Sequence, residues 1–101
     1  MVSKTSLLEA VQAFDWKALN AGLKERPDLL SHREERAKNW LHVLCSTKLK
    51  GRKPAASIKT ADVLLERGID PAIRSKPGVT ALDLAREYKH PELVAFLEKK
   101  K

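Results

Sequence analysis

The stretch Gly78–Leu97 restricts the fold of this 101-residue chain more than any other feature. Thr80 followed by Asp83 forms a capping-box pattern before a run of apolar residues that recur with the period of one helix face. Pro91 then breaks the run and suits the first turn of a second helix. The two apolar stripes consist of Ala81, Leu84, Ala85 and Tyr88, and of Leu93, Val94, Phe96 and Leu97. This pattern predicts two short amphipathic helices joined by a tight turn.

The same pattern occurs twice upstream in degenerate form, so the sequence predicts three helix pairs. They cover about 5–14 with 16–25, 40–47 with 56–66, and 81–89 with 91–99. Leu7, Leu41 and Leu82 hold equivalent positions in the first helix of each pair, separated by 34 and 41 residues. A unit that repeats at about 33 residues predicts a solenoid in which each pair packs on the next. The longer second spacing indicates a basic insertion at about 48–55 in the middle unit.

Local signals mark where these helices begin and end. Asp15 and Asn39 are expected to cap helices, because their short side chains accept hydrogen bonds from free backbone amides. Gly68 stands where a helix must stop in the left-handed conformation. Arg26-Pro27 ends the second helix, and residues 70–79 are predicted to form an extended excursion around a turn.

These motifs resemble the ankyrin-repeat family, whose pattern opens G-x-T-P-L-H-L-A. The matching segments are 78–85 with the opening, 90–97 with the second helix, 63–71 with the close, and Asn39-Trp40-Leu41-His42 with T-P-L-H. The resemblance is clear over 39–101, whereas 5–38 is similar to a divergent N-terminal capping repeat. Asp83 replaces the family histidine, and Phe14 replaces the glycine between helices.

The resemblance implies an all-α solenoid of three ankyrin-type repeats in one domain, 1–101, with repeats at about 4–37, 38–78 and 79–101. It also implies a non-enzymatic module that binds a protein partner through a concave surface of hairpins and inner helices. By position, the partner-binding candidates are Arg33, Glu35, Arg36, Trp40, Thr47, Lys48, Arg74, Lys76, Val79, Arg86, Tyr88 and Lys89. Trp40 and Tyr88 have two interpretations each, an exposed binding anchor or a side chain that packs against the neighbouring unit.

The net charge of +7 has a local origin. Residues 48–59 contain five basic side chains and no acidic one: Lys48, Lys50, Arg52, Lys53 and Lys59. Such a basic loop allows an alternative function, binding to nucleic acid or another anionic surface. No aromatic residue lies among these cations in the sequence, which disfavours base stacking. A third hypothesis is an accessory domain of a longer protein.

Residues for catalysis or metal binding are sparse. His42 and Cys45 lie three residues apart, but no further pair has the spacing of metal ligands, so we expect no metal and no cofactor. Cys45 falls at a position predicted to be buried, which disfavours a nucleophilic role. No apolar run reaches the length of a transmembrane helix, and residues 1–5 lack the apolar core of a secretion signal. We therefore expect a cytoplasmic monomer.

Overall fold

The computed structural model describes residues 3–32, 38–51 and 54–99. This part of the chain contains six α-helices, a short 3-10 helix and no strand. The all-α class predicted from the sequence is confirmed. The elements are α1 (Lys4–Gln12), α2 (Trp16–Glu25), η1 (Pro27–Ser31), α3 (Trp40–Cys45), α4 (Pro54–Glu66), α5 (Ala81–Glu87) and α6 (Pro91–Lys99).

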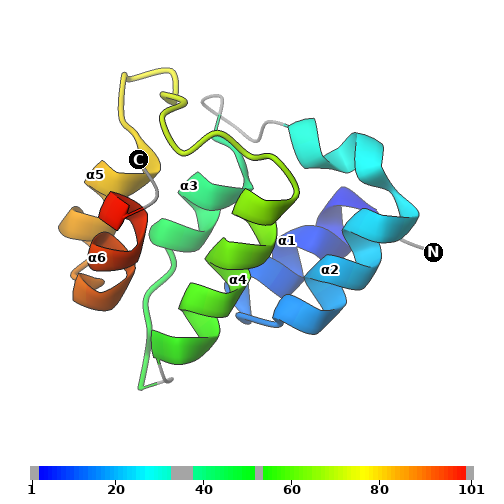
Figure 1. Ribbon diagram of the computed structural model, residues 1–101, viewed down its shortest axis with the longest axis horizontal. Coiled ribbons are helices and arrows are strands. Elements are labelled where there is room, and N and C mark those ends of the chain that lie inside the picture. Colours follow the sequence, from blue (N-terminus) through cyan, green and yellow to red (C-terminus); the bar gives the residue numbers. More distant parts are fainter. Residues whose placement is uncertain (1–2, 33–37, 52–53, 100–101) are drawn as a thin grey trace.

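The six α-helices form three antiparallel pairs that lie side by side in chain order (Figure 1). One row consists of α1, α3 and α5, with α3 packed against both neighbours. The other row consists of α2, α4 and α6, with α4 in the middle. The molecule measures 34 × 29 × 22 Å. The loop from α4 to α5 and helix η1 lie at one end of the helices, and the loop after α3 lies at the other (Figure 1).

Each helix of the first row begins with the same capping arrangement. Ser3, Asn39 and Thr80 accept a hydrogen bond from the backbone N–H three residues later, at 3.2, 2.9 and 3.2 Å respectively. In each case the side chain of that later residue bonds back to the N–H of the cap, which completes a capping box. Asp15 caps α2 through its side chain, which accepts a hydrogen bond from the Ala18 N–H. The caps predicted at Asp15, Asn39 and Thr80 are confirmed.

The turns inside the first and third pairs have the same geometry. Phe14 and Lys89 adopt left-handed conformations, with φ of 57° and 59°. In both turns the next residue donates its N–H to the carbonyl five residues earlier, at 2.8 and 2.9 Å. Phe14 and Lys89 are 75 residues apart, and so are Leu7 and Leu82, which the sequence placed at equivalent positions. The first and third helix pairs therefore share the same turn geometry.

The middle unit differs from the predicted boundaries. Helix α3 ends at Cys45 and α4 begins at Pro54, so the first two residues of α4 lie inside the insertion predicted at 48–55. The described part of the loop turns through Lys50 and Gly51, which have φ of 51° and 81°. The 3-10 helix η1 is also absent from the prediction, which ended the second helix near Pro27 without assigning structure beyond it.

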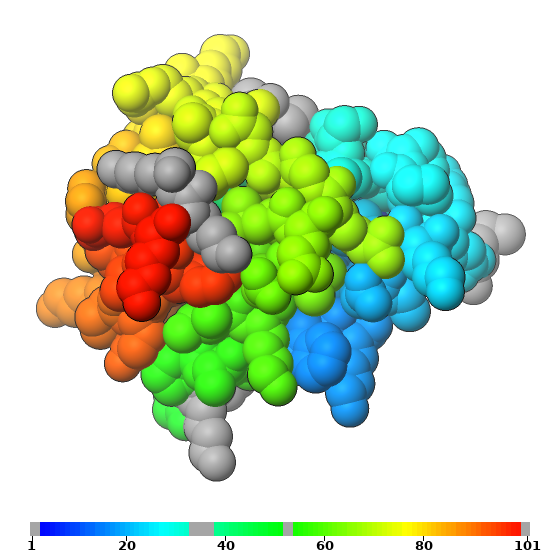
Figure 2. Space-filling model, in the orientation of Figure 1, coloured from blue at the N-terminus to red at the C-terminus, as the bar shows by residue number. Residues whose placement is uncertain are grey.

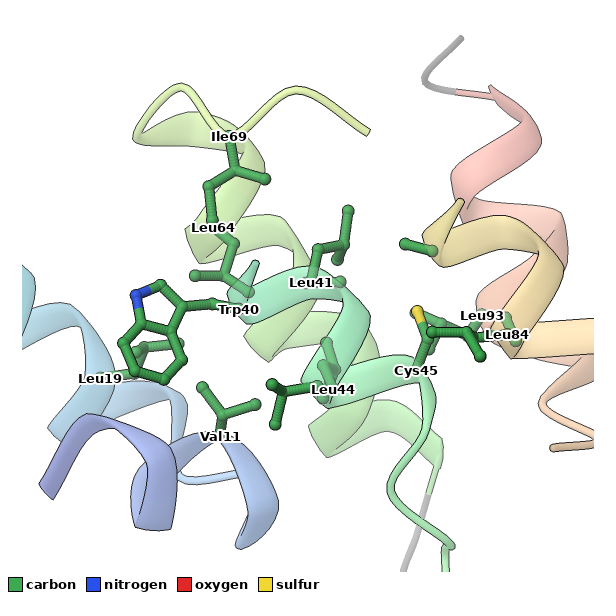
Figure 3. Packing of buried hydrophobic residues seen from close by; sticks show 14 of the residues in the cluster. Val11, Leu19, Trp40, Leu41, Leu44, Cys45, Leu64, Ile69, Leu84 and Leu93 are labelled. Carbon is green, nitrogen blue, oxygen red and sulfur yellow. The ribbon is translucent and has the colours of Figure 1, made fainter. Parts of the chain in front are cut away.

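One hydrophobic core runs through all three pairs (Figure 3). Trp40 points from α3 toward Val11 and Leu19 of the first pair. Cys45 points from the other side of α3 toward Leu84 and Leu93 of the third pair. Because these side chains are all nearly or fully buried, the hydrophobic effect joins neighbouring pairs as well as the two helices within a pair.

Candidate partner-binding surface

His42 connects the middle unit to the third. Its ring is fully buried, and Nε2 donates a hydrogen bond to the Val79 carbonyl at 2.9 Å, since a carbonyl can only accept. Nδ1 accepts from the Asn39 N–H at 3.1 Å, within the capping box of α3. In the third unit the same position is occupied by Asp83, which is exposed and caps α5 instead. Asp83 therefore leaves this side of the third unit accessible.

An open cleft of about 550 Å³ lies beside Asp83, between the loop after α4 and the helices α5 and α6. Its floor includes the buried side chains Leu82 and Leu97. Four charged residues surround the floor: Asp70, Arg74, Asp83 and Arg86. The cleft therefore combines an apolar base with charges of both signs. Of the predicted partner-binding residues, it brings together Arg74 and Arg86.

The charged side chains around this cleft are held in place by neighbours. Arg74 donates from Nη1 to the Gly78 carbonyl at 2.8 Å, and Arg86 pairs with Glu98 at 3.4 Å. Hydrogen bonds from the backbone N–H and the hydroxyl of Thr80 lower the pKa of Asp83, and the nearby Arg74 and Arg86 lower it further. Asp83 is thus ionised at neutral pH.

The loop that carries Arg74 is closed by its own backbone. The Ser75 N–H donates to the Val79 carbonyl, and the Gly78 N–H donates to the Ser75 carbonyl, both at 2.8 Å. Gly78 has a φ of 87°, which favours glycine at this turn. This turn confirms the predicted excursion, and it presents Lys76 to solvent while Val79 is half-buried.

A second group of predicted residues lies at the ends of α3 and α5, outside the lining of the cleft. Tyr88 caps the C-terminus of α5 and is 37% exposed, the one large hydrophobic residue classed as exposed among the described residues. Lys89 follows it in the left-handed turn and is exposed. At the end of α3, Lys48 is exposed, but Thr47 is half-buried and its hydroxyl donates to the Val43 carbonyl at 2.8 Å.

For Trp40 the structure supports the second interpretation, packing against the neighbouring unit, so its place among the partner-binding candidates is corrected. The family pattern places it at a partly exposed position, yet its side chain is fully buried. Its indole N–H donates to the Leu29 carbonyl in η1 at 2.8 Å, and the His32 ring lies 5.4 Å from it. Trp40 therefore packs against the first unit and cannot serve as an exposed anchor. All residues of α3 are buried in the same way, so the middle unit offers little inner-helix surface. The candidates Arg33, Glu35 and Arg36 lie outside the described residues.

The residues of the predicted basic loop do not all lie in one loop of the structure. Lys48 and Lys50 are exposed between α3 and α4, whereas Arg52 and Lys53 lie outside the described residues. Lys59 is not in a loop, because it belongs to α4. Its Nζ lies 5.0 Å from the centre of the Trp16 ring on α2. The sequence showed no aromatic residue among these cations, but the fold places Trp16 beside one of them, Lys59.

The described part of the chain offers little for catalysis or metal binding. No cluster of three or more His, Cys, Asp or Glu side chains there could hold a metal ion. Cys45 is fully buried, and burial raises the pKa of its thiol to about 12, so it stays protonated and unreactive. None of the described helices is both long and apolar enough to cross a membrane.

No protein-family model matches this sequence, and no curated protein shows significant sequence similarity to it.

Proposed function

We propose that this chain is an ankyrin-type repeat module that binds a protein partner. The support is architectural. Three helix pairs lie in chain order in two rows. Helices α1, α3 and α5 share one type of cap, and the first and third pairs share one turn at a spacing of 75 residues. Repeat arrays of this kind expose long surfaces built on rigid elements and are typically used for binding.

The observation that carries the proposal is the cleft beside α5. Its apolar base would accept a hydrophobic side chain. Charged groups that flank this side chain in the partner would pair with Arg74 and Arg86 or with Asp70 and Asp83. An extended peptide segment of a partner protein has these features. Because Arg74 and Asp83 are already held by hydrogen bonds with the backbone, they need little further ordering when the peptide binds.

We propose no catalytic role for this surface. Catalysis requires a nucleophile or a proton-transfer group with a positioned partner. In the cleft, the contacts of Asp83 with Thr80 and of Arg86 with Glu98 stabilise the fold and join neither residue to such a pair. Binding is the function that remains compatible with these contacts.

Peptide selection tests the proposal. Peptides selected against the intact chain from a random library should bind about tenfold or more weakly to Arg74→Glu, because a charge at the cleft is reversed. The matched control is Lys17→Glu, which changes the charge equally on α2, far along the chain from the cleft. Equal affinity of the selected peptides for the Arg74→Glu and Lys17→Glu variants would refute the cleft as the binding site, provided that circular dichroism shows both to be folded.

A further inference from the structure

Two lysines from different helices flank the half-buried Trp16 at the start of α2. The Nζ of Lys17 lies 5.5 Å from the centre of the indole, and the Nζ of Lys59, on α4, lies 5.0 Å from it. Figure 2 shows this outer face, where the beginning of α2 (blue) lies against α4 (green). Both distances are within the range of a cation–π interaction. The fold thus brings an aromatic face and two ammonium groups together.

Further positive charge lies in the loop that leads into α4. Lys48 and Lys50 are exposed there, and the sequence contains no acidic residue from 48 to 59. The nearest acidic residue in sequence to Trp16 is Asp15, whose carboxylate accepts the Ala18 N–H as the cap of α2. Segment 48–59 therefore carries five basic side chains and no acidic one, and its Lys59 contacts the indole.

We propose that Trp16, Lys17 and Lys59 form a binding site for single-stranded nucleic acid, with Lys48 and Lys50 extending it along the phosphate backbone. An aromatic side chain lets an unpaired base stack, and lysines attract the phosphates on either side. The lysine stems are flexible, so each ammonium group exchanges the indole face for a phosphate when a base takes its place. The sequence alone disfavoured this interaction, because Trp16 and Lys59 are far apart along the chain.

A membrane surface fits these residues less well. Binding to a bilayer surface requires apolar side chains that enter it, together with the basic ones. Tyr88 is the one large hydrophobic residue classed as exposed in the described part of the chain, and it lies at the end of α5 rather than on α2 or α4. The site also shares no residue with the cleft beside α5, so it is independent of the proposed peptide binding.

The test uses the full chain and a fluorescently labelled oligothymidylate of about 16 nucleotides, the upper site size of common single-strand binding folds. We expect binding at low salt that quenches tryptophan emission, since Trp16 is half-buried whereas Trp40 is fully buried. Trp16→Leu should weaken binding about 5- to 150-fold, the usual contribution of one stacked base. Lys59→Gln should reduce the slope of log affinity against log salt by about 0.7, the value for one phosphate contact.

The matched control is Lys76→Gln, which removes the same charge from the loop between α4 and α5. Equal losses in Lys59→Gln and Lys76→Gln, with none in Trp16→Leu, would mean diffuse attraction and overturn the proposal. The proposal would also be overturned if the chain showed no binding to the oligothymidylate at low salt, or if it bound a duplex of the same length equally well. Binding only to vesicles with equal parts of phosphatidylcholine and phosphatidylserine would overturn it too. If Trp16→Leu fails to fold, Trp16→Phe replaces it. This variant should retain affinity within a few-fold, because it keeps an aromatic face. A larger loss of affinity in a folded Trp16→Phe variant counts against stacking.

Discussion

Replacement of His42 by leucine should destabilise the junction between the middle and third helix pairs. The buried imidazole accepts a hydrogen bond from the Asn39 N–H at 3.1 Å and donates one to the Val79 carbonyl at 2.9 Å. Leucine fills a similar volume but can form neither bond. The two backbone groups would then lose their partners, which costs about 1–3 kcal/mol for each group that stays buried.

The hydrogen bond from His42 to the Val79 carbonyl is only partly buried, so in the variant water would partly replace it. We therefore expect the free energy of unfolding to fall by about 2–4 kcal/mol, out of a total of about 5–15 kcal/mol for an ordinary domain. The melting temperature should fall by roughly 10 °C or more. Urea unfolding followed by helical circular dichroism measures the loss directly.

Replacement of His90 by leucine is the matched control, and we expect it to change the free energy of unfolding in the opposite direction. His90 is buried like His42, with 2% of its surface exposed, but neither of its ring nitrogens has a hydrogen-bond partner within the described residues. His90→Leu removes two buried polar atoms without breaking a bond, so it should raise the free energy of unfolding by about 1 kcal/mol. If His42→Leu and His90→Leu changed stability in the same direction, the reasoning about these two contacts would be refuted.

Three other predictions concern single residues. Cys45 should react with iodoacetamide only after unfolding, because burial raises its thiol pKa to about 12; fast labelling of the native protein would contradict its position. Lys89→Gly should stabilise the chain by about 0.5–1 kcal/mol by relieving its left-handed conformation, whereas Phe14→Gly should destabilise it because the buried ring is lost. Trp40→Phe should cost about 1–2 kcal/mol, since the bond to the Leu29 carbonyl disappears; unchanged urea unfolding would argue against that bond.

Features set by local chemistry could be predicted from the sequence. A side chain that caps a helix bonds to a backbone amide three residues away, so Asp15, Asn39 and Thr80 could be identified without knowledge of the fold. The stop at Gly68, with a φ of 104°, follows from the conformational freedom of glycine in the same way. The periodic apolar positions also predicted the buried residues Leu7, Ala10 and Val11 of α1 and Leu93 and Leu97 of α6.

Features set by contacts between distant residues could not be predicted. For Trp40 the sequence left two interpretations open, because the choice depends on η1, which supplies a carbonyl to its indole N–H from eleven positions away. The approach of Lys59 to Trp16 depends on how α4 packs against α2. The cleft beside α5 likewise requires the loop after α4 to fold back over α5 and α6. Each of these follows from tertiary packing, which no local pattern encodes.

Nuclear Overhauser contacts between side-chain protons test the layered order of the helix pairs most directly. The arrangement predicts contacts of the Trp40 indole with the methyl groups of Leu19, and of Cys45 with those of Leu84. Contacts between the methyl groups of Val11 and Leu93, which belong to the first and third pairs, would instead indicate a closed bundle and contradict it.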